Sequence, residues 1–305
     1  IDHTKVGSTL ENFPVLVKLS SSSGIADEDL TAIFTELTTN SKKIAVTTSD
    51  GQTQCYVEIE RWDNENNLAI LWVKVPSVST SADTILYLYY DSSADNNTTY
   101  IGDTDSEVAE NVWDSNFKAV YHLNSESSIK DSTTNDNDGT ITGTLSLANG
   151  QIGKAVSIGT NEYITLTDTI TLTDYTWTIS YWLKEGGGAF DCVLGSDTNY
   201  HLIRNTNVVA QAIVQAMSDT TNLKNYRGNY TRDTDWHCYI VRRTASGNNV
   251  KIFVDGQETT YSESTMADQD LTLDYIGRFY AGVYSSSRTE GLLEELRVSN
   301  SARSD

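Results

Sequence analysis

The chain has 305 residues, and its 42 acidic side chains outnumber its 21 basic ones, which gives a formal net charge of −21. This charge argues against nucleic acid as a partner, because phosphates would repel the chain, and no apolar run approaches the ~18 residues that a membrane span needs. At roughly 150 residues per domain the length predicts two domains, and a hydrophobic content of 38% is enough to give each a packed core.

The first part of the chain predicts a small β-rich domain with one helix. Residues 12–19 alternate apolar and polar side chains, which is typical of a half-buried strand. Residues 27–37 predict the helix, because apolar side chains recur at helical spacing and acidic residues crowd its start, where the helix dipole favours them. Residues 67–75 are apolar on both faces, so we expect this strand at the centre of the domain. Other strands are expected at 43–47, 54–62 and 84–90, before a polar linker at 91–99.

The second part, from about residue 111 to the end, predicts a β-sandwich. A dozen short strands separated by turn signals, with no helical pattern among them, are typical of this architecture. Turns are expected at Asn149-Gly150, Ser246-Gly247 and Asp255-Gly256. The strands are expected at 118–123, 140–142, 155–158, 163–166, 176–183, 191–194, 200–204, 211–216, 236–243, 249–254, 273–278 and 292–299.

A loop at residues 131–139 is the strongest candidate for metal chemistry. Carboxylate and amide oxygens crowd it, and hard Ca²⁺ takes roughly six to eight oxygen ligands. Glu294 is expected on the apolar face of its strand, where a carboxylate is costly unless it is paired or metal-bound. The alternative is a polar hairpin whose side chains bond their own backbone. The predicted metal ligands are Asp131, Asn135, Asp136, Asp138 and Glu294.

A glycan site would need exposed aromatic rings together with amide or charged groups for the sugar hydroxyls. Several tyrosines fall in or near the expected loops between residues 186 and 235, whereas the tryptophans of the strands are expected in the cores. The predicted ligand-binding residues are Tyr200, Asn225, Tyr226, Arg227 and Tyr230.

The sequence offers little for catalysis. Glu58 and Glu60 resemble the paired carboxylates of a glycosidase only superficially, because alternation turns both away from the core of the first domain. No motif for a metalloprotease, a serine hydrolase or a phosphate loop occurs. We therefore expect no enzyme. Cys192 and Cys238 could form a disulfide if their strands are neighbours, and the spacing leaves this open.

Two families are suggested by longer stretches of sequence. The first set of stretches is Ile1-Asp-His-Thr-Lys-Val, Asn12-Phe-Pro-Val-Leu-Val, Val57-Glu-Ile-Glu, Leu71-Trp-Val-Lys-Val-Pro76 and Leu86-Tyr-Leu-Tyr-Tyr90. Through them residues 1–105 resemble an uncharacterised β-rich domain of large bacterial and archaeal surface proteins that is also fused to some biopolymer-transport channel proteins. The second set is Asp131-Ser-Thr, Asn137-Asp-Gly139, Thr178-Ile-Ser-Tyr-Trp-Leu183, Trp236-His237, Val250-Lys-Ile-Phe-Val-Asp-Gly256 and Glu294-Glu-Leu-Arg-Val-Ser-Asn-Ser-Ala-Arg303. Through them residues 111–305 resemble a laminin-G-like, concanavalin A-like lectin/glucanase jelly roll.

These resemblances imply an all-β protein with one short helix in the first domain, a β-sandwich followed by a jelly-roll sandwich. They imply a structural Ca²⁺ and a non-catalytic, extracellular or cell-surface module that binds a polysaccharide or glycan, or serves adhesion, within a larger protein. The first family usually has a further strand before the position of Ile1. The alternative function is therefore a subunit of an extracellular filament, in which an unpaired edge near residues 1–19 accepts a strand from another copy.

Overall fold

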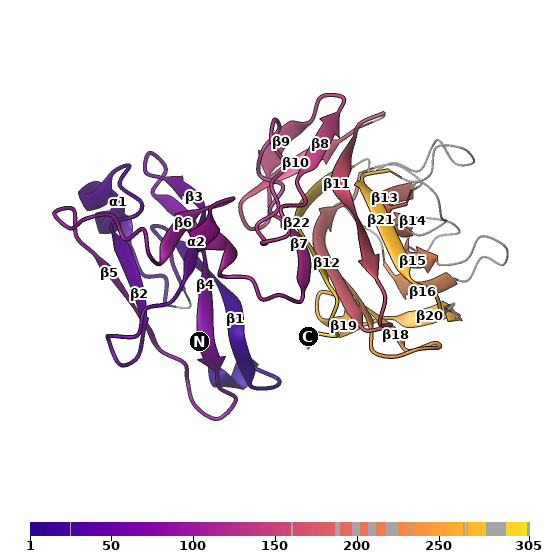
Figure 1. The fold of residues 1–305 in the computed structure, drawn as a ribbon, viewed down its shortest axis with the longest axis horizontal. Coiled ribbons are helices and arrows are strands. Elements are labelled where there is room, and N and C mark those ends of the chain that lie inside the picture. Colours follow the sequence, from indigo (N-terminus) through magenta and orange to yellow (C-terminus); the bar gives the residue numbers. More distant parts are fainter. Residues whose placement is uncertain are drawn as a thin grey trace. The chain divides into compact units, whose positions relative to one another are not determined.

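The computed structural model describes residues 1–24, 26–159, 161–186, 190–196, 202–206, 212–217, 225–231, 233–264, 266, 268–278 and 291–303. The chain forms two compact units, and each is described by itself (Figure 1). The first unit comprises Ile1–Ser115 together with Ser132–Thr134, and the second comprises Asn116–Asp131 and Asn135–Arg303.

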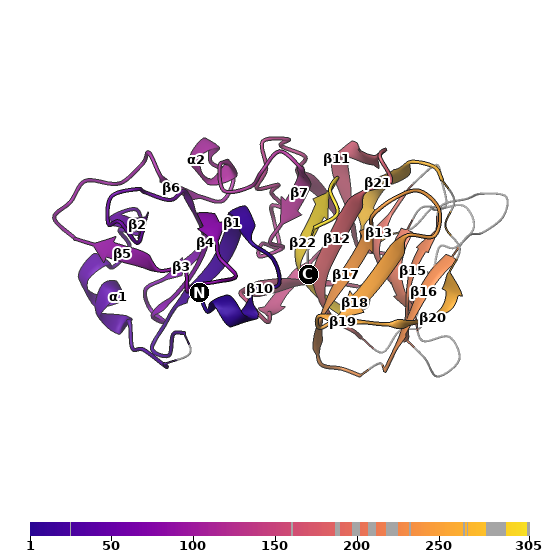
Figure 2. The same ribbon diagram turned by 90° about the horizontal axis from the view of Figure 1, so that it is seen from below.

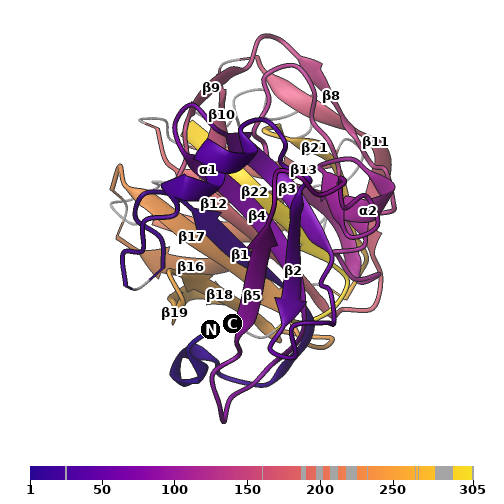
Figure 3. The same ribbon diagram turned by 90° about the vertical axis from the view of Figure 1, so that its left-hand side faces the viewer.

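The first unit is built on a four-stranded sheet. Its strands lie in the order β1 (Leu10–Leu19), β4 (Leu68–Val78), β3 (Val57–Asp63) and β6 (Ile101–Asp103), and Figure 3 shows the first three side by side. The neighbours are antiparallel except β3 and β6. β4 lies between two partners and buries the run from Ala69 to Val73 completely or almost completely, which agrees with a strand that is apolar on both faces. A two-stranded sheet joins β2 (Ile44–Thr48) to β5 (Leu86–Tyr90).

The helix expected in the first unit is present, but it begins later than expected. α1 (Thr31–Leu37) buries Ile33, Phe34 and Leu37 in the core. The acidic residues before it form a turn instead of a first helical turn, and a carboxylate oxygen of Asp29 accepts a hydrogen bond from the Thr31 amide at 3.0 Å. The unit also contains a single-turn 3-10 helix, η1 (His3–Lys5), and a second short helix, α2 (Glu107–Glu110).

The side chain of Glu58 in the first unit is buried, contrary to the expectation from the sequence. Alternation was expected to turn its side chain outward to water, yet the residue is 0% exposed. Its carboxylate accepts hydrogen bonds from the indole N–H of Trp113 at 2.6 Å and from the Ser132 hydroxyl at 2.7 Å. Trp113 packs against Trp72 on the same face of the sheet, with ring centroids 5.7 Å apart. The second face of this sheet is therefore covered, which a strand pattern alone does not reveal.

The second unit consists of two antiparallel sheets, each with eight strands among the described residues. Figure 2 shows them as two layers. The strands of the first sheet are β19 (Gln257–Glu258), β18 (Val250–Val254), β17 (Trp236–Arg243), β12 (Trp177–Lys184), β22 (Gly291–Ser299), β10 (Lys154–Ile158) and β9 (Ser146–Asn149), with β7 (Phe117–Tyr121) also paired to β22. Those of the second sheet are β20 (Thr260–Ser264), β16 (Asn225–Tyr230), β15 (Ala212–Met217), β14 (Leu202–Thr206), β13 (Phe190–Gly195), β21 (Leu271–Ile276), β11 (Tyr163–Leu172) and β8 (Gly139–Thr142).

The core of the second unit is made by the inward faces of both sheets. Ile179 and Val241 contribute from the first sheet, and Ile164, Ile203 and Leu273 from the second, each fully buried. This arrangement confirms the predicted all-β sandwich. Cys192 on β13 and Cys238 on β17 belong to different sheets and are free thiols, so the suggested disulfide is not formed. Among the described helices, none has the length and apolar character needed to cross a bilayer.

Candidate functional site

The predicted cation loop is held together by its own hydrogen bonds. Asp131 is 0% exposed, and its two carboxylate oxygens accept from the backbone amides of Val120 at 2.9 Å and Asn137 at 3.1 Å. The Asp138 carboxylate accepts from the Asp131 amide at 3.0 Å and from the Lys130 ammonium at 2.6 Å. These contacts do not form the all-oxygen shell that Ca²⁺ prefers, because N–H groups and an ammonium surround the carboxylates. The loop fits a hydrogen-bonded hairpin, and calcium stays a prediction.

The other predicted metal ligands point elsewhere. Asn135 donates to the carbonyl oxygens of Phe117 at 3.1 Å and Lys118 at 3.4 Å, and Asp136 is exposed, with a backbone φ of 50°. Glu294 is 1% exposed, and its carboxylate accepts from the backbone amides of residues 151–153, in the turn between β9 and β10. Burial raises the pKa of Glu294 to about 7, although the backbone donors act in the opposite direction. The structure thus brings Asp131 and Asp138 together and places Glu294 at a different turn.

In the first unit, Asp2, His3 and Asp83 bring three possible metal-binding atoms within 4.8 Å of one another. The Nδ1 atom of His3 lies 2.7 Å from Asp83, and the His3 amide also donates to that carboxylate at 3.0 Å. Asp2 accepts from the Thr4 amide and hydroxyl. These surface contacts account for the cluster as a tie between the first residues and the loop before β5.

Four of the five predicted glycan-binding residues lie on β16, while Tyr200 lies outside the described residues. Tyr226 is 6% exposed, packs against Tyr261 with ring centroids 4.9 Å apart, and donates its hydroxyl to the Asn248 carbonyl oxygen. The expectation of an exposed Tyr226 ring on a loop is therefore wrong, because strand alternation turns Tyr226 and Tyr230 toward the core. Arg227 lies on the other face of the strand and is half-buried, and Asn225 begins the strand.

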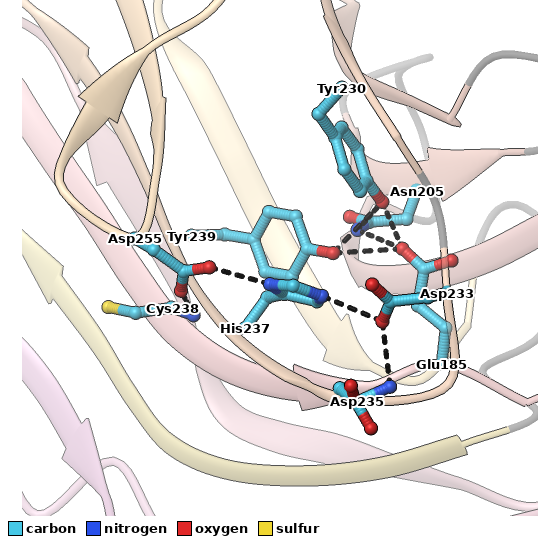
Figure 4. A network of polar contacts seen from close by, with 9 residues as sticks. All are labelled: Glu185, Asn205, Tyr230, Asp233, Asp235, His237, Cys238, Tyr239 and Asp255. Atoms are coloured by element: carbon cyan, nitrogen blue, oxygen red, sulfur yellow. Dashed lines mark hydrogen bonds and ion pairs between the residues drawn. The ribbon is translucent and has the colours of Figure 1, made fainter.

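Tyr230 belongs to a buried polar network at one end of the sandwich (Figure 4). We call it the Glu185 cluster; its members are Glu185, Tyr181, Asn205, Tyr230 and Tyr239. Glu185 directly follows β12 and is 3% exposed. One of its carboxylate oxygens accepts hydrogen bonds from the side-chain amide of Asn205 at 2.7 Å, from the Tyr239 hydroxyl at 3.0 Å and from the Tyr230 hydroxyl. Tyr181 donates to the side-chain oxygen of Asn205 at 2.9 Å. Burial and the negative charge of Glu185 raise the pKa of both Tyr230 and Tyr239, so both hydroxyls keep their protons and can donate.

His237 lies beside this cluster, between two carboxylates, as Figure 4 shows. Its Nδ1 atom is 2.6 Å from Asp255 and its Nε2 atom is 2.9 Å from Asp233, and Asp255 also accepts from the Cys238 amide. Burial acts to lower the pKa of His237, but the hydrogen bonds and charges of Asp255 and Asp233 raise it overall. The ring therefore ties the start of β17 to the turn after β18. Together with the Glu185 cluster it fixes the end of the sandwich through internal contacts.

A different group lies on the outward face of the second sheet. We call it the arginine–tyrosine platform; it consists of Tyr163 on β11, Tyr275 on β21 and Arg278. The two half-buried rings meet edge to face with centroids 5.7 Å apart, and the guanidinium carbon of Arg278 lies 4.3 Å from the Tyr163 centroid and 4.9 Å from the Tyr275 centroid. Such cation–π contacts stabilise by about 0.5–2 kcal/mol each. In the part of the chain that the structure describes, Arg278 has no hydrogen-bond acceptor.

The backbone conformation of β21 and of the residues after it sets the position of the platform. Gly277 has a φ of +80°, which favours glycine, and a side chain there would come within 2.9 Å of Ile158. On β21, Leu273 and Ile276 are both buried, and the two residues between them, Asp274 and Tyr275, are both partly exposed. The Asp274 carboxylate accepts from Thr169 at 2.5 Å and from Ser196 at 2.9 Å. The strand therefore departs from simple alternation where Tyr275 turns outward.

Only part of the arginine–tyrosine platform could have been predicted from the sequence. Tyr163 shares the polar face of its strand with Thr165, so its outward direction could have been inferred from alternation. Tyr275 follows an irregularity in the pairing of β11 with β21, and Arg278 follows a left-handed glycine. The directions of the Tyr275 and Arg278 side chains therefore cannot be predicted from a repeating pattern.

Two family models match the chain. Residues 158–305 match the concanavalin A-like lectin/glucanases superfamily, and residues 40–116 match a domain of unknown function (DUF2341). The chain therefore carries a DUF2341 domain followed by a concanavalin A-like domain, as the sequence predicted. No curated protein sequence gives a significant match.

Several solved structures are similar to the chain. Domain 4 of AbnA, a GH43 extracellular arabinanase from Geobacillus stearothermophilus solved with arabinotriose, is 20% identical, with a TM-score of 0.42 over 62% of this chain and 94% of that domain. The binding domain of Paraclostridial Mosquitocidal Protein 1 is 11% identical, with a TM-score of 0.44, over 62% of this chain and 50% of that one. The binding domain of botulinum neurotoxin serotype C1 is 10% identical, with a TM-score of 0.43, over 62% of this chain and 49% of that one. The alignments thus span about half of each toxin domain, and likeness this distant carries no inference about a ligand.

Proposed function

We propose that the second unit is a non-catalytic carbohydrate-binding module of a secreted or cell-surface protein, and that the arginine–tyrosine platform holds the sugar. A concanavalin A-like fold suits a binding module. The observation that carries the proposal is the platform itself: two partly exposed tyrosine rings joined by a guanidinium on one face of a rigid sheet.

The chemistry of the platform matches that of a sugar. The Arg278 guanidinium covers part of both tyrosine rings, so a sugar would contact the apolar ring surface that remains exposed, and the Tyr163 hydroxyl offers a polar contact at the ring edge. The rings hold the Arg278 guanidinium by its flat face, which leaves its N–H groups to donate sideways to hydroxyl or carboxylate oxygens. A module of this kind needs orientation and hydrogen bonds, and it needs no group that exchanges a proton with its ligand.

The platform is also preorganised. Tyr163 and Tyr275 are on neighbouring strands of the same sheet, and Gly277 sets the direction of the segment that carries Arg278. Groups held in place before binding lose little conformational freedom when the ligand arrives, so more of the contact energy remains as affinity.

The test is a glycan array with the full chain, followed by calorimetric titration of the best ligand. Tyr163→Ala and Arg278→Ala should each weaken binding about tenfold, which corresponds to about 1.4 kcal/mol. Arg242→Ala is a matched control, because Arg242 lies over the Phe253 ring at 5.1 Å on the other sheet and should leave binding unchanged. Full affinity in Arg278→Ala, or the absence of any array ligand, would contradict the proposal.

A second candidate function is self-assembly by strand addition in the first unit. β1 is ten residues long and, among the described residues, pairs on one side only, with β4. An open strand edge can accept a strand from another chain. Pro14 and the exposed Lys18 on β1 are features that edge strands use against such pairing, so we rank this candidate second. Sedimentation and electron microscopy test it, because a monomer at every concentration without filaments would exclude it.

A further inference from the structure

The first unit exposes a row of tyrosines that its own fold does not use. Of the six large hydrophobic side chains exposed in the described part of the chain, four lie on or next to β5: Ile85 at 53%, Tyr87 at 46%, Tyr89 at 48% and Tyr90 at 38%. The cause is strand alternation. The side chains of Leu86 and Leu88 pack against the core, so those of Ile85, Tyr87 and Tyr89 turn to solvent, whereas Tyr90, the last residue of the strand, does not follow this alternation. A concentration of exposed rings on one strand marks an interaction site more often than scattered single residues do.

One hollow adjoins each end of β5. One, of about 370 Å³, is lined by residues 84–86 of the strand entrance together with hydroxyl-bearing side chains such as Thr48 and Ser77. The other, of about 410 Å³, is lined by Tyr89 and Tyr90 together with Asp95 and Asn97. Apolar residues also line both hollows, Val75 and Pro76 in the first and Ile44 in the second, so each hollow is lined by polar and apolar groups together.

Several polar groups around the row have no hydrogen-bond or ion-pair partner within the described residues. Within the described residues, the hydroxyls of Tyr87, Tyr89 and Tyr90 and the carboxylate of Asp95 make no hydrogen bond or ion pair. Tyr87 and Tyr89 stand next to each other, with ring centroids 6.4 Å apart and planes tilted by 55°. Two adjacent rings with free hydroxyls at their edges form a surface that is apolar in the middle and hydrogen-bonding at its rim.

We propose that this surface binds a neutral polysaccharide chain, which lies along β5 with its sugar rings on Tyr87 and Tyr89 and its hydroxyls in the two hollows. An extended polymer fits a row with a hollow at each end better than a compact ligand does. A net charge of −21 repels acidic polymers, so a neutral one is favoured. The hydroxyl groups of Thr48 and Ser77 and the carboxylate of Asp95 in the hollows suit the many hydroxyls of a sugar chain.

This site is separate from the one proposed on the second unit, and neither proposal depends on the other. It assigns a binding activity to the domain whose family has no known function. A chain with both sites would hold a polysaccharide matrix at two points, and two linked contacts bind more tightly than either alone when both can be engaged at once.

The experiment uses the full chain with soluble xylan and mixed-linkage β-glucan in affinity gels, and with insoluble cellulose and chitin in sedimentation binding. Tyr87→Ala/Tyr89→Ala should reduce retention by at least one of these probes about tenfold or more. Tyr87→Phe/Tyr89→Phe keeps both rings and should lose less than about threefold. Asp95→Asn keeps both rings and should lower affinity a few-fold through the hollow that Asp95 lines. Because these side chains are exposed, all variants should keep the parent's circular dichroism and melting temperature.

Separate outcomes distinguish this proposal from the one on the second unit. Loss in the Tyr87→Ala/Tyr89→Ala variant with retention in Tyr163→Ala supports the β5 site even if the second unit binds nothing. Full binding by the Tyr87→Ala/Tyr89→Ala variant, or no retention of the parent chain by any of the four probes, overturns it. Sedimentation of the parent chain as a dimer that Tyr87→Ala/Tyr89→Ala dissociates, without binding to any probe, would show instead that the tyrosines form an interface between copies.

Discussion

Replacement of Glu185 by alanine tests how much the end of the second unit depends on one buried carboxylate. The side chain is 3% exposed and accepts hydrogen bonds from Asn205, Tyr230 and Tyr239. A hydrogen bond to a charged group contributes about 1.5–3 kcal/mol, and a buried donor left without its acceptor costs about 1–3 kcal/mol. Water that enters the vacated space would accept hydrogen bonds from some of these donors and restore part of the lost free energy. We therefore expect the free energy of unfolding of the second unit to fall by about 4 kcal/mol.

For a unit of this size, about 1 kcal/mol changes the melting temperature by about 2–4 °C, so the midpoint should fall by about 8–16 °C. Calorimetry of the full chain measures it, with the transition of the first unit as an internal reference. Glu126→Ala is the matched control, because Glu126 is exposed and its loss should change stability by less than about 0.5 kcal/mol. A shift below about 2 °C for Glu185→Ala would refute the reasoning, since it would mean that the three donors find equal partners elsewhere.

Three further predictions concern other parts of the second unit. Because burial raises the pKa of Glu294 to about 7, the folded state keeps a proton that the unfolded chain releases above about pH 4.5. Stability should therefore fall by about 3 kcal/mol as the pH rises to about 7, and Glu294→Gln should flatten this trend in melting curves. Asp131→Ala should cost about 3 kcal/mol, since two buried amides lose their acceptor. A lower melting temperature of the parent in EDTA would support the calcium prediction, and an unchanged one would contradict it. Gly277→Ala should destabilise by about 1–3 kcal/mol and weaken glycan binding, whereas Gly256→Ala, at a φ of +75° in open space, should affect stability alone.

Local periodicity was enough to predict most elements of the fold. The apolar residues of α1 recur at helical spacing, and the same residues, Ile33, Phe34 and Leu37, are buried. Alternation predicted several strands closely, for example 236–243 against β17 (Trp236–Arg243), whereas 163–166 covers only the first part of β11 (Tyr163–Leu172). Such patterns are informative because a single buried face imposes its period on the sequence. The start of α1 was missed because acidic residues favour a helix start and a turn equally well.

The candidate sites depended much more on contacts between distant segments. Glu58 was expected at the surface, but Trp113, 55 residues later, covers it. Tyr226 was expected on a loop, but its strand turns it into the core against Tyr261. The tyrosines of β5 stood in a recognisable strand pattern, yet their exposure depends on nothing packing over that face in the described structure.

The sequence by itself determined the class of this protein: two β-rich units, the helix α1 with its buried face, and the resemblance to two families along the chain. These properties follow from periodicity and composition, which are local. Only the tertiary structure decided which polar groups are available to a ligand. Both carboxylate oxygens of Asp131 and one of Glu185 accept hydrogen bonds inside the fold, whereas Arg278 and the β5 tyrosines are the groups that we propose for ligand binding. That difference arises from which distant strands become neighbours, and no local pattern encodes it.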